Sequence, residues 1–214
     1  MCAVYRGPVC KLCRREGRKI FLKGNRCKTA KCSFEKKEYP PGQHAGSSGF
    51  FRQSGYGIQL REKQKVRRSV QMTEKQFKRF FSIAEKTPGP TGANLLILLE
   101  SRMDNVLRRM GFSLSINEAR QIINHCHVKV NGRVCNIASY VVAPADRISF
   151  KKKSVNLESV KKAIEENEGM PSPEWLKTDT AKRSGEVIRL PERDEITLCG
   201  GEISENLIVE LYSK

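Results

Sequence analysis

Apolar positions in the central part of the chain first follow a helical period. They recur at spacings of three and four, which predicts a short helix that ends at Gly111. The residues of this face are Met103, Val106, Leu107 and Met110. A second helix is predicted directly afterwards, because Ser115 and Glu118 have the spacing of a capping box. Its core-facing residues are Ile116, Ala119, Ile122, Ile123 and Cys126.

The period then changes from helical to alternating. Valines flank a lysine over residues 128–130, which predicts a strand. Asn131-Gly132 follows and predicts a hairpin, because both central positions of the favoured turn need positive φ. We expect a second strand pair over 140–142 and 148–150. Two helices followed by a small antiparallel sheet make this an α+β module.

Helices are predicted before the module as well. The capping pair Thr73 and Gln76 begins one, and Pro88-Gly89-Pro90 ends it. Its buried stripe consists of Phe77, Phe80, Phe81 and Ala84. The leucines of 95–99 begin the next helix, which leads into the module.

After the module, the pattern weakens. Leu157, Val160 and Ile164 predict an amphipathic helix that ends near Gly169. Trp175 and Leu176 are expected to anchor the following segment to the module. We expect a loop over 177–185, and strands or extended segments over 186–190 and 206–212.

Positive charge is distributed unevenly along the chain. The chain of 214 residues has 40 Lys and Arg against 23 Asp and Glu, a net charge of +17. Residues 1–153 hold 32 basic and 10 acidic side chains, whereas 154–214 hold 8 and 13. A cationic surface attracts polyanions by steering and counterion release. We therefore expect nucleic acid on the first three-quarters and a basic protein or solvent on the acidic tail.

The N-terminal residues contain no apolar run typical of a signal peptide, and the run of 95–99 is too short for a membrane span. These features favour a cytoplasmic protein. In that compartment, the eight cysteines indicate metal binding rather than disulfides.

Four of the cysteines have the spacing of a metal site: Cys10, Cys13, Cys27 and Cys32. Two close pairs of thiolates suit tetrahedral zinc, and metal ligation would supply folding energy to a segment with few apolar residues. An iron–sulfur cluster also takes four cysteines, and four free thiols are the third possibility. Arg14 and Arg15 lie beside the ligands and are candidate RNA contacts.

A Pro- and Gly-rich stretch over 39–49 marks a boundary, and His44 within it is interpreted as a loop residue or RNA contact rather than a ligand. Aromatic and basic residues then interleave over 50–72, a composition expected against RNA. The alternative is a basic helix face in water. The candidate contacts are Tyr56, Arg61, Lys63, Lys65, Arg67 and Arg68.

The segments Arg102–Asn105, Ser115–Gln121 and Val130–Arg133 resemble the S-four-type RNA-binding module, the αL fold named after a ribosomal protein. In that family the second helix and the loop before the hairpin lie against RNA. The alternative is a solvated polar face with no ligand. The resemblance implies RNA contacts at Arg102, Arg109, Asn117, Arg120, Asn124, His125, Lys129, Asn131 and Arg133.

The resemblance to the bacterial small-subunit ribosomal protein S-four family extends over the whole chain. It includes Gly7-Pro8, Cys13–Gly17, Pro41–His44, Leu60–Lys65, Arg133–Tyr140, Pro191–Arg193 and Leu207–Lys214. It implies an α+β protein in three parts. These are a four-cysteine metal-binding segment over 1–44, a helical domain over 45–101 completed by 186–214, and the RNA-binding module with its acidic extension over 102–185.

The family implies a structural constituent of the small ribosomal subunit. Its members bind the 5′ domain of the subunit's RNA at a multi-helix junction and nucleate assembly. The family also implies a place near the messenger entry channel, contact with the fifth small-subunit protein that influences accuracy, and autorepression in some bacteria. One departure is the sequence AGSSGFF over 45–51, where the family often has several basic residues for messenger handling.

Two other classes compete with this interpretation. Pseudouridine synthases carry the same module, and Asp104 is placed like their catalytic aspartate. However, an aspartate also favours a helix's first turn, and the 110 residues that follow leave no room for a catalytic domain. A zinc-containing DNA-binding regulator would need a recognition helix after the cysteines, and the sequence shows neither that helix nor a dimerisation heptad.

Overall fold

A computed structural model describes residues 5, 7–43, 54–155, 157–169 and 172–213. His44 and the AGSSGFF segment lie outside the described residues. The chain divides into two compact units. Unit 1 comprises Met1–Leu96 and Thr197–Lys214, and unit 2 comprises Ile97–Ile196. The combination of helices with an antiparallel sheet confirms the α+β class.

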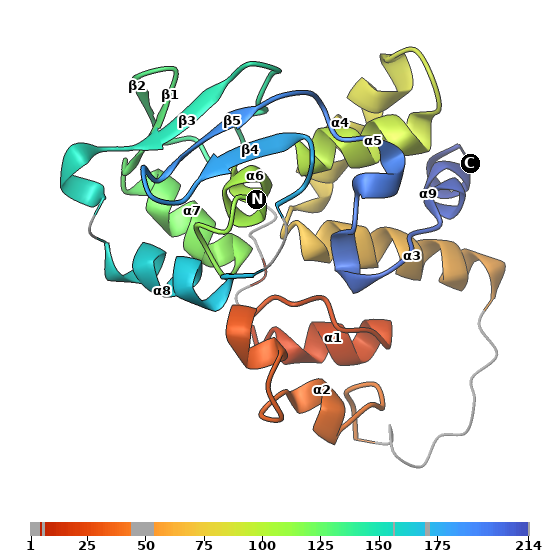
Figure 1. Cartoon of the computed structure of the whole chain (residues 1–214). Coiled ribbons are helices and arrows are strands. Elements are labelled where there is room, and N and C mark those ends of the chain that lie inside the picture. The colour runs from red at the N-terminus through yellow and green to blue at the C-terminus, as the bar shows by residue number, and fades with distance from the viewer. Residues whose placement is uncertain (1–4, 6, 44–53, 156, 170–171, 214) are drawn as a thin grey trace. The chain divides into compact units, whose positions relative to one another are not determined.

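Unit 2 contains a five-stranded sheet in the order β2-β1-β3-β5-β4, and each neighbouring pair is antiparallel (Figure 1). Its strands are β1 (Val128–Val130), β2 (Arg133–Cys135), β3 (Arg147–Phe150), β4 (Leu176–Asp179) and β5 (Ser184–Val187). Its α-helices are α6 (Met103–Arg109), α7 (Ile116–Asn124) and α8 (Glu158–Glu166). It also contains two short 3-10 helices, η2 (Lys152–Ser154) and η3 (Arg193–Glu195).

Local sequence signals explain the start of this unit. The Ser115 side chain accepts a hydrogen bond from Glu118 N at 3.3 Å and so caps α7. The Glu118 carboxylate reaches one residue further than a capping box does and accepts from Leu114 N at 2.7 Å. Asn131 and Gly132 have φ of 50° and 80°, which confirms the tight hairpin between β1 and β2.

Apolar side chains of both helices and the sheet form one core. Met103, Val106 and Leu107 of α6 pack with Ile122 and Ile123 of α7. The strands, α8 and the segment after it complete this core, through Val128, Val130, Ile148, Phe150, Val160, Trp175, Leu176 and Val187. The expected anchoring by Trp175 and Leu176 is confirmed, since both are buried.

Unit 1 joins the two ends of the chain. Its N-terminal segment contains α1 (Cys10–Glu16), η1 (Gly24–Cys27) and α2 (Ser33–Lys36). There follow α3 (Gly55–Ser69), α4 (Glu74–Lys86) and α5 (Thr91–Glu100), within which the division between the units falls. The C-terminal segment adds η4 (Leu198–Gly200) and α9 (Glu205–Tyr212). The predicted capping box of Thr73 and Gln76 is confirmed at the start of α4.

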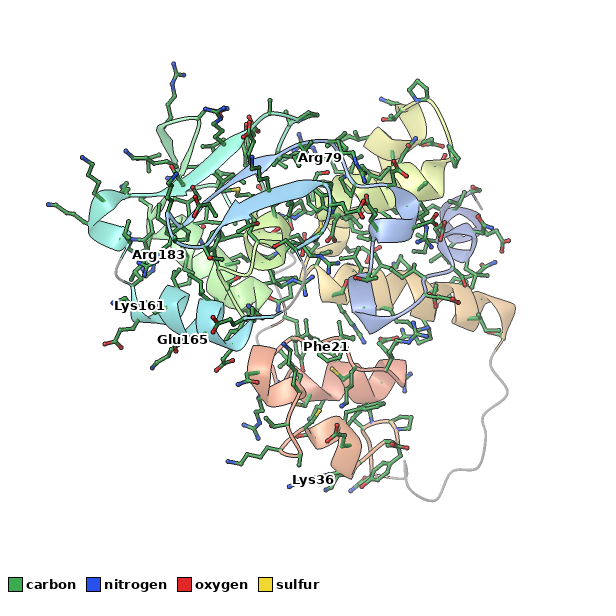
Figure 2. All side chains as sticks on the ribbon, viewed as in Figure 1. Phe21, Lys36, Arg79, Lys161, Glu165 and Arg183 are labelled. Carbon is green, nitrogen blue, oxygen red and sulfur yellow. The ribbon has the colours of Figure 1, made fainter. Side chains whose placement is uncertain are left out.

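The C-terminal segment holds the N-terminal segment by close contacts. Arg18 Nη1 donates to the carbonyl of Glu202 at 2.7 Å. Gly200 has φ of 64° and lies against Phe21, which Figure 2 labels. A Cβ at Gly200 would come within 2.6 Å of Phe21 Cε2. A residue without a side chain is therefore needed at this position.

Three expectations about the second half were wrong. Residues 205–212 form the helix α9 rather than an extended segment. Residues 177–185 are largely the hairpin of β4 and β5 rather than a loop. Residues 140–142 contribute a single bridge, Arg102 with Val141, and β3 pairs instead with β1 and β5. The hairpin of β4 and β5 is local but is extended by pairing of β5 with the distant β3, and α9 contacts the distant helices α3 and α4.

The helical domain was expected to end with residues 186–214. Of these, residues 186–196 fall in unit 2, and the part that belongs to unit 1 begins at Thr197. In the part of the chain that the structure describes, no helix is long and apolar enough to cross a membrane.

Candidate nucleic-acid interface

The outer face of α7 presents the polar side chains that the sequence predicted there. Asn117, Asn124 and His125 are exposed. Arg120 lies on the same helix with its side chain 19% exposed, and its Nε donates to Asp104 Oδ2 at 2.8 Å. The face therefore exposes the two asparagine amides and the histidine imidazole to solvent. The Arg120 guanidinium is partly exposed, and its ion pair with Asp104 of α6 fixes its position.

Asp104 is the centre of a buried ionic group. Arg102 donates to both of its carboxylate oxygens, at 3.1 Å from Nε and 2.9 Å from Nη2. Asp104 also accepts from Asn105 N at 3.0 Å, and its side chain is only 1% exposed. Paired, bidentate geometry of this kind satisfies charges that burial would otherwise penalise. Arg102, expected at the RNA surface, is 4% exposed and lies inside this group.

The hairpin turn carries two more predicted residues. Asn131 Nδ2 donates to Asp146 Oδ1 at 2.7 Å, and its Oδ1 accepts from Arg147 N at 2.9 Å. Its side chain therefore links the turn to β3. Arg133, at the start of β2, is exposed, and Lys129 on β1 is half-buried.

The basic residues of α3 face carboxylates of unit 1. Arg61 Nη1 lies 3.2 Å from Glu16 Oε1, and Glu16 forms a second ion pair with Arg68. Lys65 Nζ lies 2.6 Å from Glu62 Oε2. Lys63, which is 7% exposed, lies 2.6 Å from Glu74 Oε1, and Arg67 lies 3.4 Å from the same carboxylate. These five side chains are held within the fold, and whether they also meet phosphates stays a prediction.

Glu16 shows how strongly this region is buried. Its side chain is fully buried, and burial raises the pKa of its carboxyl above the ordinary value. Arg68 and Arg61 lower that pKa and offset part of the effect. The ion pairs therefore compensate the desolvation of Glu16 only in part.

The remaining predicted contacts differ in exposure. Tyr56 at the start of α3 is 59% exposed, and Arg15 on α1 is exposed. Arg14 donates to the carbonyls of Tyr39 and Pro40, and its guanidinium lies 4.8 Å from the centre of the Tyr39 ring. Arg109 forms an ion pair with the buried Glu100.

The four predicted metal ligands lie in the N-terminal segment. Cys13, Cys27 and Cys32 are buried, Cys10 is half-buried, and none forms a disulfide. Burial raises the pKa of the Cys13 thiol most, and the charges of Cys27, Cys10 and Cys32 raise it further, so the four groups are near neighbours. In the described ranges, however, no three or more His, Cys, Asp or Glu side chains are arranged to hold a metal ion.

One basic group of unit 2 was not among the predicted contacts. Lys151, Lys152 and Lys153 follow β3 directly, and Lys152 and Lys153 are exposed. The signal was available as three successive lysines after a predicted strand. Their proximity to His127, just before β1, depends on the pairing of Val128 with Phe150 and could not be predicted from the sequence.

Comparison with known proteins agrees with this arrangement. Residues 4–100 match the family model described as "Ribosomal protein S4/S9 N-terminal domain", and residues 101–148 match the "S4 domain". Small ribosomal subunit protein uS4 of Natranaerobius thermophilus is 52% identical over 99% of this chain and all of its own length. The uS4 proteins of Caldicellulosiruptor saccharolyticus and Thermus thermophilus are 51% and 46% identical, each over 98% of this chain and 99% of theirs.

The fold and the matched domains define a ribosomal protein with an RNA-binding module. The family can be stated more closely, because these relatives share one name and align with nearly the whole chain. The chain belongs to the uS4 family of small ribosomal subunit proteins. It is a structural component of the small subunit and not an enzyme. In agreement, the Asp104 carboxylate is buried among its hydrogen-bond partners and is not placed as a nucleophile.

Proposed function

We propose that this protein binds the 5′ domain of the small-subunit ribosomal RNA at a multi-helix junction and nucleates assembly of the subunit. The observation that carries the proposal is the charge distribution together with the exposed polar face of α7. Residues 1–153 hold 32 basic and 10 acidic side chains, and Asn117, Asn124 and His125 are exposed, as is Arg133 at the start of β2. RNA helices are recognised through phosphates, hydroxyls and shape, and a junction fixes several backbones at defined angles.

Two further roles accompany this proposal. One is contact with the fifth small-subunit protein, through which the protein influences translational accuracy. The other is a place near the messenger entry channel, with contact to messenger RNA and repression of the protein's own synthesis. Family membership supports both roles. The acidic residues of 154–214 support a protein partner over RNA for that part of the chain.

We also propose that Cys10, Cys13, Cys27 and Cys32 hold a zinc ion, with an iron–sulfur cluster as the alternative. Three observations support this site: the pairwise spacing, the nearness of the four thiols, and a small apolar cluster that contains Cys13 together with Ile20 and Leu22. Elemental analysis of the purified protein should find about one zinc per chain, and Cys27→Ser should lower that content. A metal-free protein with an unchanged melting curve after chelation would refute the site.

A binding experiment tests the RNA proposal. The full chain is titrated with a junction from the 5′ domain and with an unbranched duplex of equal length, at several salt concentrations. We expect tighter binding to the junction and a steep fall of affinity with salt, because phosphate contacts release counterions. Equal affinity for the duplex, or a nearly flat salt dependence, would contradict the proposal.

A further inference from the structure

Antiparallel register brings basic residues from distant parts of unit 2 to one end of the sheet. Val128 of β1 pairs with Phe150 of β3, so His127 and Lys151 come next to each other at that end. Lys151 N donates to the His127 carbonyl at 2.9 Å and continues the ladder by one bond. Ser149 pairs with Ser184, which places Arg183, labelled in Figure 2, at the same end.

The residues around this end are held in place by the backbone and by one side-chain bond. Cys126 has φ of 60°, and its N–H and that of His127 return to the carbonyls of Ile123 and Ile122 at the end of α7. His127 Nδ1 lies 2.8 Å from Ser154 Oγ, and Ser154 is 5% exposed. This bond ties the lysines of η2 to the start of β1, and the rings of His125 and His127 lie 6.0 Å apart.

This group differs from the basic residues of α3 and α6. The side chains of α3 are paired with Glu16, Glu62 and Glu74, and Arg109 of α6 is paired with Glu100. Among the described residues, no carboxylate forms a salt bridge with His125, His127, Lys151, Lys152 or Lys153. Burial, His125 and Lys151 lower the pKa of His127, as expected where positive groups gather without a compensating anion.

We propose that Lys151, Lys152 and Lys153, with His125 and His127, form a phosphate-binding site at this end of the sheet for the backbone of the RNA that α7 faces. The inference rests on the proposed RNA binding and adds a second point of contact to it. His125, the residue after α7, belongs to both surfaces, so one RNA backbone can run from the amides of α7 onto the lysines of η2. Lysine ammonium groups suit phosphate as point charges, without the planar geometry that base recognition requires.

The test compares two variants that remove equal charge. In the first, Lys151, Lys152 and Lys153 are all changed to Gln. In the control, Lys75, Lys78 and Lys86 on α4 are changed to Gln; these are exposed and form no salt bridge with a described residue. Thermal melting confirms that both variants fold. Binding of the junction RNA is then measured from low to moderate salt.

We expect the first variant to bind about tenfold or more weakly than the control at moderate salt. Its slope of log affinity against log salt should be smaller by about 2–3, because each lost phosphate contact removes about 0.7–0.9. Equal affinities and slopes for the two variants would overturn the inference. If the unchanged protein does not prefer the junction at all, the proposed function fails instead, and the two failures are thereby distinguished.

A second measurement needs no variant. The native protein is acetylated with and without junction RNA, and the modified lysines are identified by mass spectrometry. We expect RNA to reduce acetylation of 151–153 at least fivefold while Lys177, exposed on β4, keeps its reactivity. Unchanged acetylation of 151–153 in the RNA-bound protein would refute the site.

Discussion

Tyr212 donates its hydroxyl to Glu74 Oε1 at 2.9 Å, across 138 residues of sequence. The Tyr212 ring packs against Phe81, with ring centres 4.5 Å apart, and Lys63 Nζ lies 5.6 Å from its centre. Gln59 Nε2 donates to Glu210 Oε2 at 2.8 Å, two residues before Tyr212 in α9. The last helix of the chain is therefore fastened to α3 and α4 by aromatic packing and by hydrogen bonds to charged groups.

Removal of the Tyr212 hydroxyl should weaken this attachment. We expect Tyr212→Phe to lower the free energy of unfolding by about 1 kcal/mol, because Glu74 loses a donor but keeps Lys63 and the ring keeps its packing. Urea unfolding measures the change. The control is Tyr56→Phe, whose exposed ring should leave the free energy unchanged. Equal values for the two variants would show that the hydroxyl contributes nothing.

Acid should weaken the same region. Burial by itself raises the pKa of Glu74, but hydrogen bonds from Lys63 and Tyr212 outweigh it and lower that pKa overall. The stability that Glu74 contributes is therefore complete above the ordinary glutamate pKa of about 4.3 and is lost as the pH falls through its lower folded value.

The experiment follows the free energy of unfolding from about pH 6 to pH 3 for the unchanged protein and for Glu74→Gln. We expect the unchanged protein to lose more stability over this range, since its ionised carboxylate is the group being protonated. Parallel curves for the two proteins would contradict the assignment.

Asp104 should be the most sensitive position of unit 2. We expect Asp104→Asn to lower the free energy of unfolding by about 3 kcal/mol, because Arg102 and Arg120 lose the carboxylate that neutralises them in a buried place. Asp194→Asn, an exposed aspartate of η3, should change it by less than about 0.5 kcal/mol. Denaturant unfolding compares the two, and a small effect at both positions would refute the buried ionic group.

The hairpin turn allows backbone and side-chain effects to be separated. Asn131→Gly removes the bonds to Asp146 and Arg147 but tolerates the φ of 50°. Asn131→Ala removes the same bonds and adds the strain of a left-handed backbone, about 1 kcal/mol more. In thermal or urea unfolding, Asn131→Ala should therefore be less stable than Asn131→Gly. The reverse order would mean that backbone strain does not control this turn.

Much of the fold was predictable because its signals are local. The capping serines and threonines, the Asn131-Gly132 turn and the helical spacing of Met103 and Leu107 each act over a few residues. The helix of 205–212 was missed because its apolar and β-branched residues suit either state. Its attachment to α3 and α4, over more than a hundred residues, decides in favour of the helix.

The candidate interface was likewise predictable only in part. Composition correctly indicated which part of the chain carries the positive charge, but it could not show which cations remain available. Lys63 was predicted as a contact from the basic composition of its segment and Arg102 from the family resemblance, and the fold places them beside Glu74 and Asp104. Glu74 lies on a different helix from Lys63, and Asp104, only two residues from Arg102, is shared with Arg120 of α7. Helical spacing rules relate residues three or four apart and indicated neither pair.

The sequence by itself determined the family, the basic character and the local starts and turns of the helices and strands, since these follow from residue type and short spacing. Only the tertiary structure decided which charges neutralise one another and which lysines and histidines meet at the end of the sheet. The physical reason is that an ion pair or a shared phosphate site depends on distances of a few ångströms between side chains. Those distances are set by strand register and helix packing, which join residues far apart in the chain.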